Sequence, residues 1–278
     1  MPRSEVRTVR SSGGLDYRLY VAWPSQPPPP SGYPLVLMLD ANAAFATAVE
    51  AIRMRSPRAD ATGVVPAVVA GVGYPLDAPY ERERRTYDYT ATAAEAAGEG
   101  RAGAPAAGGA AGFLAFLESE LLPLIHERLA IDPARQTLFG HSLGGLFVVH
   151  ALLARPQAFQ SFIAASPSLW WNRAVVDDAI EARLACAATP RAQRVLITVG
   201  EYEQALAPWQ LGQAQAAAIA ARRQERRMVD DARMLAARLA PLAAVVRFEL
   251  YEGEDHASVV LRSIGSGLRF CLADETVA

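Results

Sequence analysis

The chain has 278 residues, 51% of them hydrophobic, and carries a formal net charge of −2 with a pI near 6.1. This length and apolar content are enough for one large α/β domain or two small ones. Because the chain is nearly neutral overall, it has no general attraction for nucleic acid or an anionic membrane, and any anionic ligand must be held by local arginines.

No secretory or membrane signal is visible in the sequence. The first residues, MPRSEVRTVRSSGG, contain no apolar core of a signal peptide, and no window is long and apolar enough for a membrane span. We expect a cytoplasmic protein without membrane insertion, or a periplasmic one if this is the mature form of an exported chain. Cys186 and Cys271 lie in helix-like apolar segments, which predicts buried free thiols and excludes a disulfide scaffold.

Short apolar or β-branched runs alternate along the chain with longer amphipathic segments. Such runs are typical of strands buried on both faces of a parallel sheet. They cover residues 34–40, 67–74, 136–140, 161–166, 194–200 and 245–252, after an alternating run at 17–23 that predicts an edge hairpin strand. Helices are predicted over residues 43–55, 112–129, 143–153, 173–187, 226–239 and 257–272. The pattern predicts a single α/β domain, residues 1–278, with a mostly parallel central sheet flanked by helices.

Two stretches interrupt this alternation. The proline-rich segment WPSQPPPPSGYP, residues 23–34, predicts a rigid surface connection between strands. The Ala/Gly-rich segment at residues 91–112 is too long for an ordinary connection. We expect it to be either a flexible surface insertion or a mobile lid.

A serine stands at the junction of a predicted strand and a predicted helix, within Gly140-His141-Ser142-Leu143-Gly144. In that setting Gly-x-Ser-x-Gly is the nucleophile elbow of an α/β-hydrolase. The strained turn lifts the serine hydroxyl above the sheet, and the following helix directs its N-terminal amides at the site. Ser142 is therefore predicted to be a catalytic nucleophile.

The chain has only four histidines, so the base that activates the serine can be found by elimination. His126 lies inside a predicted helix, and His150 lies about two turns into the helix after the elbow. His141 adjoins the nucleophile, and we expect its side chain to point elsewhere. His256 follows the last predicted strand, which is where the base of an α/β-hydrolase is found.

The acid of the triad should lie between nucleophile and base, after the preceding strand. Glu203 stands three residues after the strand-ending Gly200, as in many hydrolases of this fold, and is the predicted acid. Glu201 is the alternative. Asp255 is adjacent to His256 and is poorly placed to orient that ring.

An oxyanion hole requires two backbone N–H donors. One is predicted to be Leu143, the residue after the nucleophile. The other belongs to the loop after residues 34–40, at Ala41 or Asn42.

Together these motifs resemble the putative-esterase (esterase D-like) family of α/β-hydrolases. Within it, the chain is similar to the esterases that open catecholate siderophore trilactones such as enterobactin, salmochelin and bacillibactin. The resemblance extends over nearly the whole chain and is carried by YPLVLMLDANAAF, GVGYP, RRTYDYT, FLAFLESELLPLI, LFGHSLGGLF, SPSLWWN, ITVGEYEQ and DHASVVLRSIGSGLRF. One departure is Ala41, where family members usually have glycine.

The resemblance implies a substrate with strong negative charge when it carries iron, so a local arginine cluster is expected. Arg84 and Arg85, with Arg82 nearby, supply one, and Trp170 and Trp171 offer flat apolar surfaces for catechol rings. The alternative is that Arg85 pairs with Asp88 and that the tryptophans belong to the core. The later arginines are expected to form a solvated helix face; they are Arg222, Arg223, Arg226 and Arg227.

The expected function is a serine esterase that hydrolyses a catecholate siderophore, or its ferric complex, through an acyl-enzyme. No cofactor is expected, and no metal site, because the sequence contains no His/Cys/carboxylate cluster with the spacing of metal ligands. Iron would arrive within the small-molecule substrate. The alternatives are a general carboxylesterase for small acyl, feruloyl or thiol esters, and a non-catalytic hydrolase-fold binding protein. No nucleic-acid partner is expected.

Overall fold

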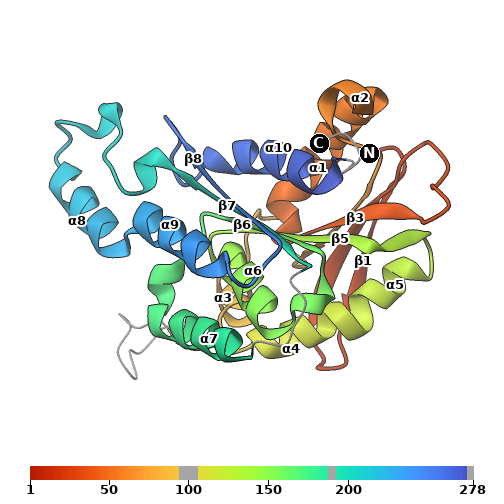
Figure 1. Ribbon diagram of the computed structural model, residues 1–278, viewed down its shortest axis with the longest axis horizontal. Helices are drawn as coiled ribbons and strands as arrows, with labels where there is room; N and C mark the ends of the chain where they lie inside the picture. Colours follow the sequence, from red (N-terminus) through yellow and green to blue (C-terminus); the bar gives the residue numbers. More distant parts are fainter. Residues whose placement is uncertain (94–105, 187–191, 274–278) are drawn as a thin grey trace.

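The computed structural model describes residues 1–93, 106–186 and 192–273. Its centre is an eight-stranded sheet in the order β1-β2-β4-β3-β5-β6-β7-β8 (Figure 1). The strands are β1 (Ser4–Arg10), β2 (Asp16–Ala22), β3 (Tyr33–Met38), β4 (Val68–Gly73), β5 (Ile131–His141), β6 (Ser161–Ala165), β7 (Arg194–Gly200) and β8 (Val245–Tyr251). Strand β2 runs antiparallel to both of its neighbours, and all other pairings are parallel. The predicted α/β-hydrolase fold with a mostly parallel sheet is confirmed.

Helices cover both faces of this sheet (Figure 1). They are α1 (Ala41–Arg55), α2 (Ala59–Thr62), α3 (Arg82–Tyr89), α4 (Ala110–Phe116), α5 (Leu122–His126), α6 (Leu143–Ala154), α7 (Arg173–Ala185), α8 (Ala216–Arg226), α9 (Met228–Leu239) and α10 (Val259–Leu272). A π-helical turn over Leu117–Leu121 joins α4 to α5. Within the described ranges, no helix has the length and apolarity needed to cross a membrane.

The strand β3 shows how the two cores form. All six of its residues are buried, and successive side chains point to opposite faces of the sheet. Val36 and Met38 pack in the core beneath α1 and α10, whereas Leu35 and Leu37 pack in the core beneath α4, α6 and α9. A strand that is apolar on both faces can be stable only inside such a sandwich of layers.

Three features differ from the sequence expectations. Strand β1 was not predicted, and it takes the edge position expected for β2; its sequence SEVRTVR is polar because much of an edge strand faces solvent. The polar helices α3 and α8 were also not predicted. Cys186 is exposed, contrary to expectation, because α7 buries only Ile180 fully and leaves its C-terminal end on the surface; Cys271 is buried, as expected.

The predicted lid or insertion at residues 91–112 lies partly outside the described residues, which omit 94–105. In the described part, the chain leaves and returns beside Thr90, whose carbonyl accepts hydrogen bonds from the amides of Gly108 (3.0 Å) and Ala110 (3.2 Å). The helix α4 then begins at Ala110.

Candidate active site

Ser142 occupies a strained turn between β5 and α6, with φ 62° and ψ −118°. The turn brings strand and helix so close that a Cβ added at Gly140 would lie 2.2 Å from the carbonyl oxygen of Gly144. A Cβ at Gly145 would lie 2.7 Å from the carbonyl oxygen of Ala165, whereas one at Gly144 would make only ordinary contacts. Close packing of strand and helix therefore requires glycine at positions 140 and 145 but not at 144. This backbone conformation is the strained elbow that exposes a nucleophile.

Three side chains from the carboxyl ends of three parallel strands form one hydrogen-bonded chain. Ser142 Oγ lies 3.0 Å from His256 Nε2, and His256 Nδ1 lies 2.5 Å from Glu203 Oε2. Glu203 is buried, and its other carboxylate oxygen accepts hydrogen bonds from Ser166 Oγ (2.5 Å) and the amide of Gly200 (2.8 Å). The carboxylate is thus fixed on one side and faces the imidazole on the other.

The two other carboxylates near the imidazole have structural partners. Glu201 Oε2 accepts a hydrogen bond from the amide of Gly253 at 2.8 Å, which ties it to the loop that carries the histidine. Asp255 accepts hydrogen bonds from the amides of Ala257 (2.8 Å) and Ser258 (2.9 Å) just before α10. The hydrogen bond from the backbone of Ser258 is the main cause that lowers the pKa of Asp255. Neither carboxylate has a hydrogen bond to the imidazole.

The other histidines lie in three different environments. The ring of His141, which we expected to point away from the nucleophile, packs against His256 with 4.6 Å between ring centroids. Burial, together with the neighbouring imidazole, holds the pKa of His141 well below its ordinary value. His126 is hydrogen bonded to Gln136 (2.9 Å), and His150 lies on α6, where burial lowers its pKa.

The three predicted oxyanion donors all lie at helix N-termini. Leu143 is the first residue of α6, and Ala41 and Asn42 are the first two residues of α1. The first amides of a helix have no intrahelical partner, so these N–H groups remain available to a ligand. The Asn42 side chain donates to the carbonyls of Tyr74 and Leu76, both at 3.0 Å, and thereby joins the start of α1 to the loop after β4.

The residue before Ala41 is held by a buried ion pair. Asp40 has a left-handed backbone conformation, with φ 49°, and its carboxylate oxygens accept hydrogen bonds from Arg85 Nε (3.1 Å) and an Arg85 Nη (2.8 Å). Its amide donates to the hydroxyl of Tyr89 at 3.2 Å. The Arg85 guanidinium therefore positions the loop that carries the candidate oxyanion amide.

These contacts change the interpretation of the arginines at 84 and 85. The alternative, that Arg85 pairs with Asp88, is wrong in its partner: Arg85 pairs with Asp40, and Asp88 lies 3.7 Å from Arg84. The Arg84 guanidinium also lies over the rings of Tyr17 and Tyr74. Both arginines point into the protein, so their geometry does not support the expected role in holding a substrate anion.

One arginine of α8, Arg226, lies beside Trp170. The Arg226 guanidinium stacks over the Trp170 ring at 4.1 Å. Burial lowers the pKa of both Arg223 and Arg226, and repulsion from Arg222 lowers it further. Among the described residues, none of these three arginines forms a salt bridge, whereas Arg227 lies near two aspartates of α9. The expectation of a solvated helix face is therefore wrong for Arg223 and Arg226, which are half-buried. It holds for Arg222 and Arg227, which are exposed.

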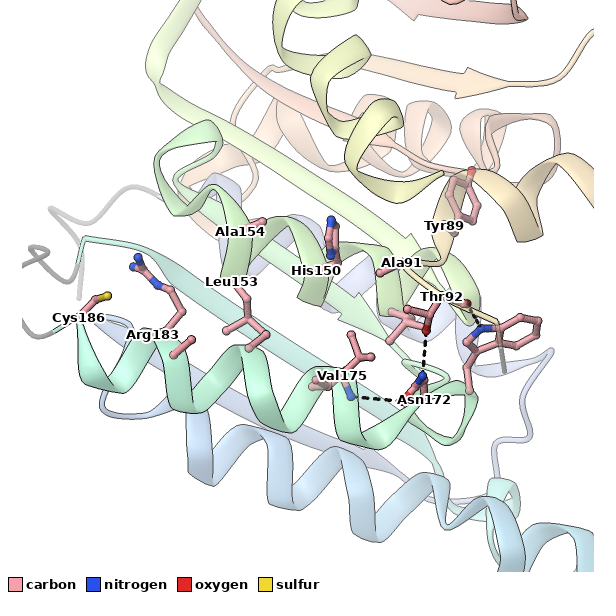
Figure 2. Close-up of a pocket in the computed structure, with 15 residues that line it drawn as sticks. Tyr89, Ala91, Thr92, His150, Leu153, Ala154, Asn172, Val175, Arg183 and Cys186 are labelled. Carbon is pink, nitrogen blue, oxygen red and sulfur yellow. Dashed lines mark hydrogen bonds between the residues drawn. The ribbon is translucent and has the colours of Figure 1, made fainter. Parts of the chain in front are cut away.

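Trp171 has a separate environment from Trp170. Its Nε1 donates to the carbonyl of Thr92 at 2.9 Å, and Asn172 Nδ2 donates to the Thr92 hydroxyl at 2.8 Å. These residues form one end of an apolar pocket of about 380 Å³ between α6 and α7 (Figure 2). No member of the Ser–His–Glu chain lines it.

Some residues of the site were not found from the sequence. Ser168 Oγ lies 3.3 Å from Ser142 Oγ, and Ser166, Asp40 and Tyr89 support the acid or the oxyanion loop. The motif SPSLWWN contains both serines, and its position directly after β6 was the available signal. Within the described ranges, no group of three or more His, Cys, Asp or Glu side chains is placed to hold a metal ion.

The sheet order, the elbow and the Ser–His–Glu geometry define an α/β-hydrolase. The chain belongs to the putative esterase family, whose model matches residues 11–238. It is 38% identical to the ferri-bacillibactin esterase BesA of Bacillus subtilis (strain 168), over 98% of this chain and 90% of that protein. It is 33% identical to the siderophore triacetylfusarinine C esterase of Aspergillus fumigatus, over 99% and 94% of the two chains.

A solved structure supports the same family assignment. The crystal structure of the BES protein from Bacillus cereus is similar with a TM-score of 0.81 and 36% identity, covering 98% of this chain and 95% of that one. The family and these relatives make the protein a carboxylic ester hydrolase.

Proposed function

We propose that the protein is a serine esterase that hydrolyses the ester bonds of a siderophore, with Ser142 as nucleophile, His256 as general base and Glu203 as the acid. The observation that carries this proposal is the continuous hydrogen-bonded chain from Ser142 Oγ through His256 to the buried Glu203. A serine hydroxyl becomes an effective nucleophile only when an oriented base can remove its proton.

The geometry gives each group one task. With His256 Nδ1 donating to Glu203, Nε2 accepts the proton of Ser142 as Oγ forms a bond to the ester carbonyl carbon. The negative charge that develops on the carbonyl oxygen is held by the amide of Leu143 and one from Ala41 or Asn42. The tetrahedral intermediate then collapses, and His256 returns the proton to the departing alkoxide. Water, activated by the same imidazole, cleaves the acyl-enzyme and restores the serine.

The substrate class is supported by the relatives and by the surface beside the site. The relatives are named as esterases of ferri-bacillibactin and of the siderophore triacetylfusarinine C. Arg226, stacked on Trp170, presents a cation and an aromatic face together, which suits an anionic aromatic ligand such as a catecholate. A catecholate siderophore or its ferric complex is therefore the proposed substrate. Arg226 and Trp170 take the substrate-binding role that the sequence assigned to Arg84 and Arg85.

The catalytic roles are tested by Ser142→Ala, His256→Ala and the double variant, each checked for folding by circular dichroism. We expect each single variant to lose nearly all turnover of 4-nitrophenyl acetate and of a siderophore trilactone. The double variant should be scarcely worse than either single one, because nucleophile and base act as a unit. Turnover near the wild-type rate in either single variant would reject the assignment.

A further inference from the structure

The pocket between α6 and α7 is formed by small residues and by loose packing of α7 (Figure 2). Ile180 is the only fully buried residue of α7. Ala154 on α6 and Ala179 and Ala182 on α7 line the pocket, where larger side chains would fill the gap. The result is an apolar space of about 380 Å³, the size of a small-ligand site.

Three residues that line this pocket are hydrogen bonded to residues of the candidate site. The lining residue Leu146 donates its amide to the carbonyl of Ser142 at 3.0 Å. The lining residue Trp171 donates its amide to the carbonyl of Ser168 at 3.1 Å, and Ser168 Oγ lies 3.3 Å from Ser142 Oγ. Tyr89 also lines the pocket, and its hydroxyl accepts a hydrogen bond from the amide of Asp40. These hydrogen bonds join the pocket lining to Ser142, to its neighbour Ser168 and to Asp40, which precedes the candidate oxyanion amide.

The walls are apolar apart from a few polar groups, among them His150 and Arg183. His150 Nε2 is buried and has no hydrogen-bond partner among the described residues. Burial lowers the pKa of His150, so its ring is neutral near pH 7 and can exchange one hydrogen bond with a ligand. Arg183 lies toward the opposite end, near Cys186 (Figure 2). A buried polar atom without a partner is costly unless a ligand satisfies it.

We propose that this pocket receives one hydroxyaryl arm of an iron-free ester, on the acyl side of the bond that Ser142 attacks. The ring lies between the apolar walls, and one phenolic hydroxyl shares a hydrogen bond with His150. This proposal rests on the proposed esterase function.

The pocket distinguishes the two forms of a catecholate trilactone. In the iron-free ester each arm moves independently, so a single ring can enter. In the ferric complex the catechol oxygens bind the metal and the arms are joined through it, so no separate ring and no free hydroxyl reach His150. The ferric form must then be recognised outside the pocket, where Arg226 and Trp170 lie.

Pocket-filling variants test this proposal on the full-length enzyme. Ala179→Phe should raise KM for iron-free enterobactin about tenfold, while KM for ferric enterobactin and for 4-nitrophenyl acetate changes less than about twofold. His150→Phe, which keeps a ring but removes the nitrogen, should show the same selectivity. Ala185→Phe on the exposed end of α7, outside the pocket lining, is the matched control and should match the wild type.

Ala182→Phe gives the same test from a more exposed lining position if Ala179→Phe does not fold. Equal changes in KM for all three substrates, or no change for iron-free enterobactin, would overturn the pocket assignment and leave the esterase function intact. A wild-type enzyme that hydrolyses 4-nitrophenyl acetate but neither form of enterobactin would instead reject the siderophore substrate, and the pocket assignment with it.

Discussion

Arg85 donates hydrogen bonds to both carboxylate oxygens of Asp40, at 3.1 and 2.8 Å, and so fixes the residue that precedes Ala41. A non-glycine residue with positive φ is strained by about 1–2 kcal/mol and needs support from its surroundings. Asp40 receives that support from Arg85 and from the Tyr89 hydroxyl. The ion pair thereby links helix α3 to the loop that presents the candidate oxyanion amide.

Loss of this ion pair should impair the chemical step more than substrate binding. We expect Arg85→Met to lower kcat on the order of tenfold to a hundredfold, with little change in KM, for neutral and anionic esters alike, because a displaced amide no longer stabilises the oxyanion. The neighbouring Arg84→Met removes a comparable cation that does not contact Asp40 and is the control. A selective rise in KM for a ferric siderophore in Arg85→Met would show that this arginine binds substrate directly.

The two glutamates that follow β7 allow a matched comparison. Glu203→Gln should lower kcat by a hundredfold or more, because the amide no longer holds the imidazole in the tautomer that accepts the serine proton. Glu201→Gln makes the same chemical change at a residue bonded to Gly253, and its kcat should stay within a few-fold of the wild type. Steady-state kinetics on 4-nitrophenyl acetate measures both. Equal, small losses would indicate a Ser–His pair that works without a dedicated acid.

The cation on the Trp170 ring should contribute to binding of charged substrates alone. Arg226→Gln should raise KM for a ferric trilactone about three- to tenfold and leave 4-nitrophenyl acetate unaffected, since the guanidinium contributes binding energy remote from the reacting ester. Added salt should raise KM for the ferric substrate in the wild type and less so in the variant. Arg227→Gln, at a residue near α9 aspartates, is the control. The same salt dependence in Arg226→Gln and wild type would contradict this role.

Asp88 should make stability depend on pH. Burial raises its pKa from 3.8 to about 6, so between those values the folded protein keeps a proton that the unfolded chain has lost. The folded state binds more protons there, and the Asp88 contribution to the free energy of unfolding must fall as pH rises from about 4 to about 6. The loss is at most about 3 kcal/mol.

Urea unfolding of the wild type and Asp88→Asn at pH 4, 5, 6 and 7 measures this contribution. Other titrating groups are common to both proteins, so the difference in free energy of unfolding, wild type minus variant, reports on Asp88 alone. It should decrease from pH 4 to about pH 6 and then level off. A constant difference would mean that folding leaves the pKa of Asp88 unchanged.

Local sequence signals located the three residues that the structure joins in one hydrogen-bonded chain. The elbow is a short motif at a strand–helix junction, and only one of the four histidines follows the last strand. The position of Glu203 after Gly200 likewise depends on one turn. Parallel strands then bring these residues to the same edge of the sheet, whatever their separation along the chain.

Partners from distant segments could not be read from the sequence in the same way. Four consecutive residues contain Arg82, Arg84 and Arg85, yet adjacency does not reveal that Arg85 turns toward Asp40, forty-five positions away. The contact between Arg226 and Trp170 likewise depends on how α8 is placed over the motif SPSLWWN. Cys186 illustrates the same limit, because its exposure follows from loose packing of α7 and not from its apolar neighbours.

The most direct test of the proposed function is product analysis by mass spectrometry after incubation of iron-free and ferric enterobactin with the wild type and with Ser142→Ala. The wild type should convert at least one form to the linear trimer and then to shorter fragments, each ester cleavage adding one water, and Ser142→Ala should leave the trilactone intact. An intact trilactone with a wild-type enzyme that hydrolyses 4-nitrophenyl acetate, or linear products formed by Ser142→Ala, would contradict the proposal.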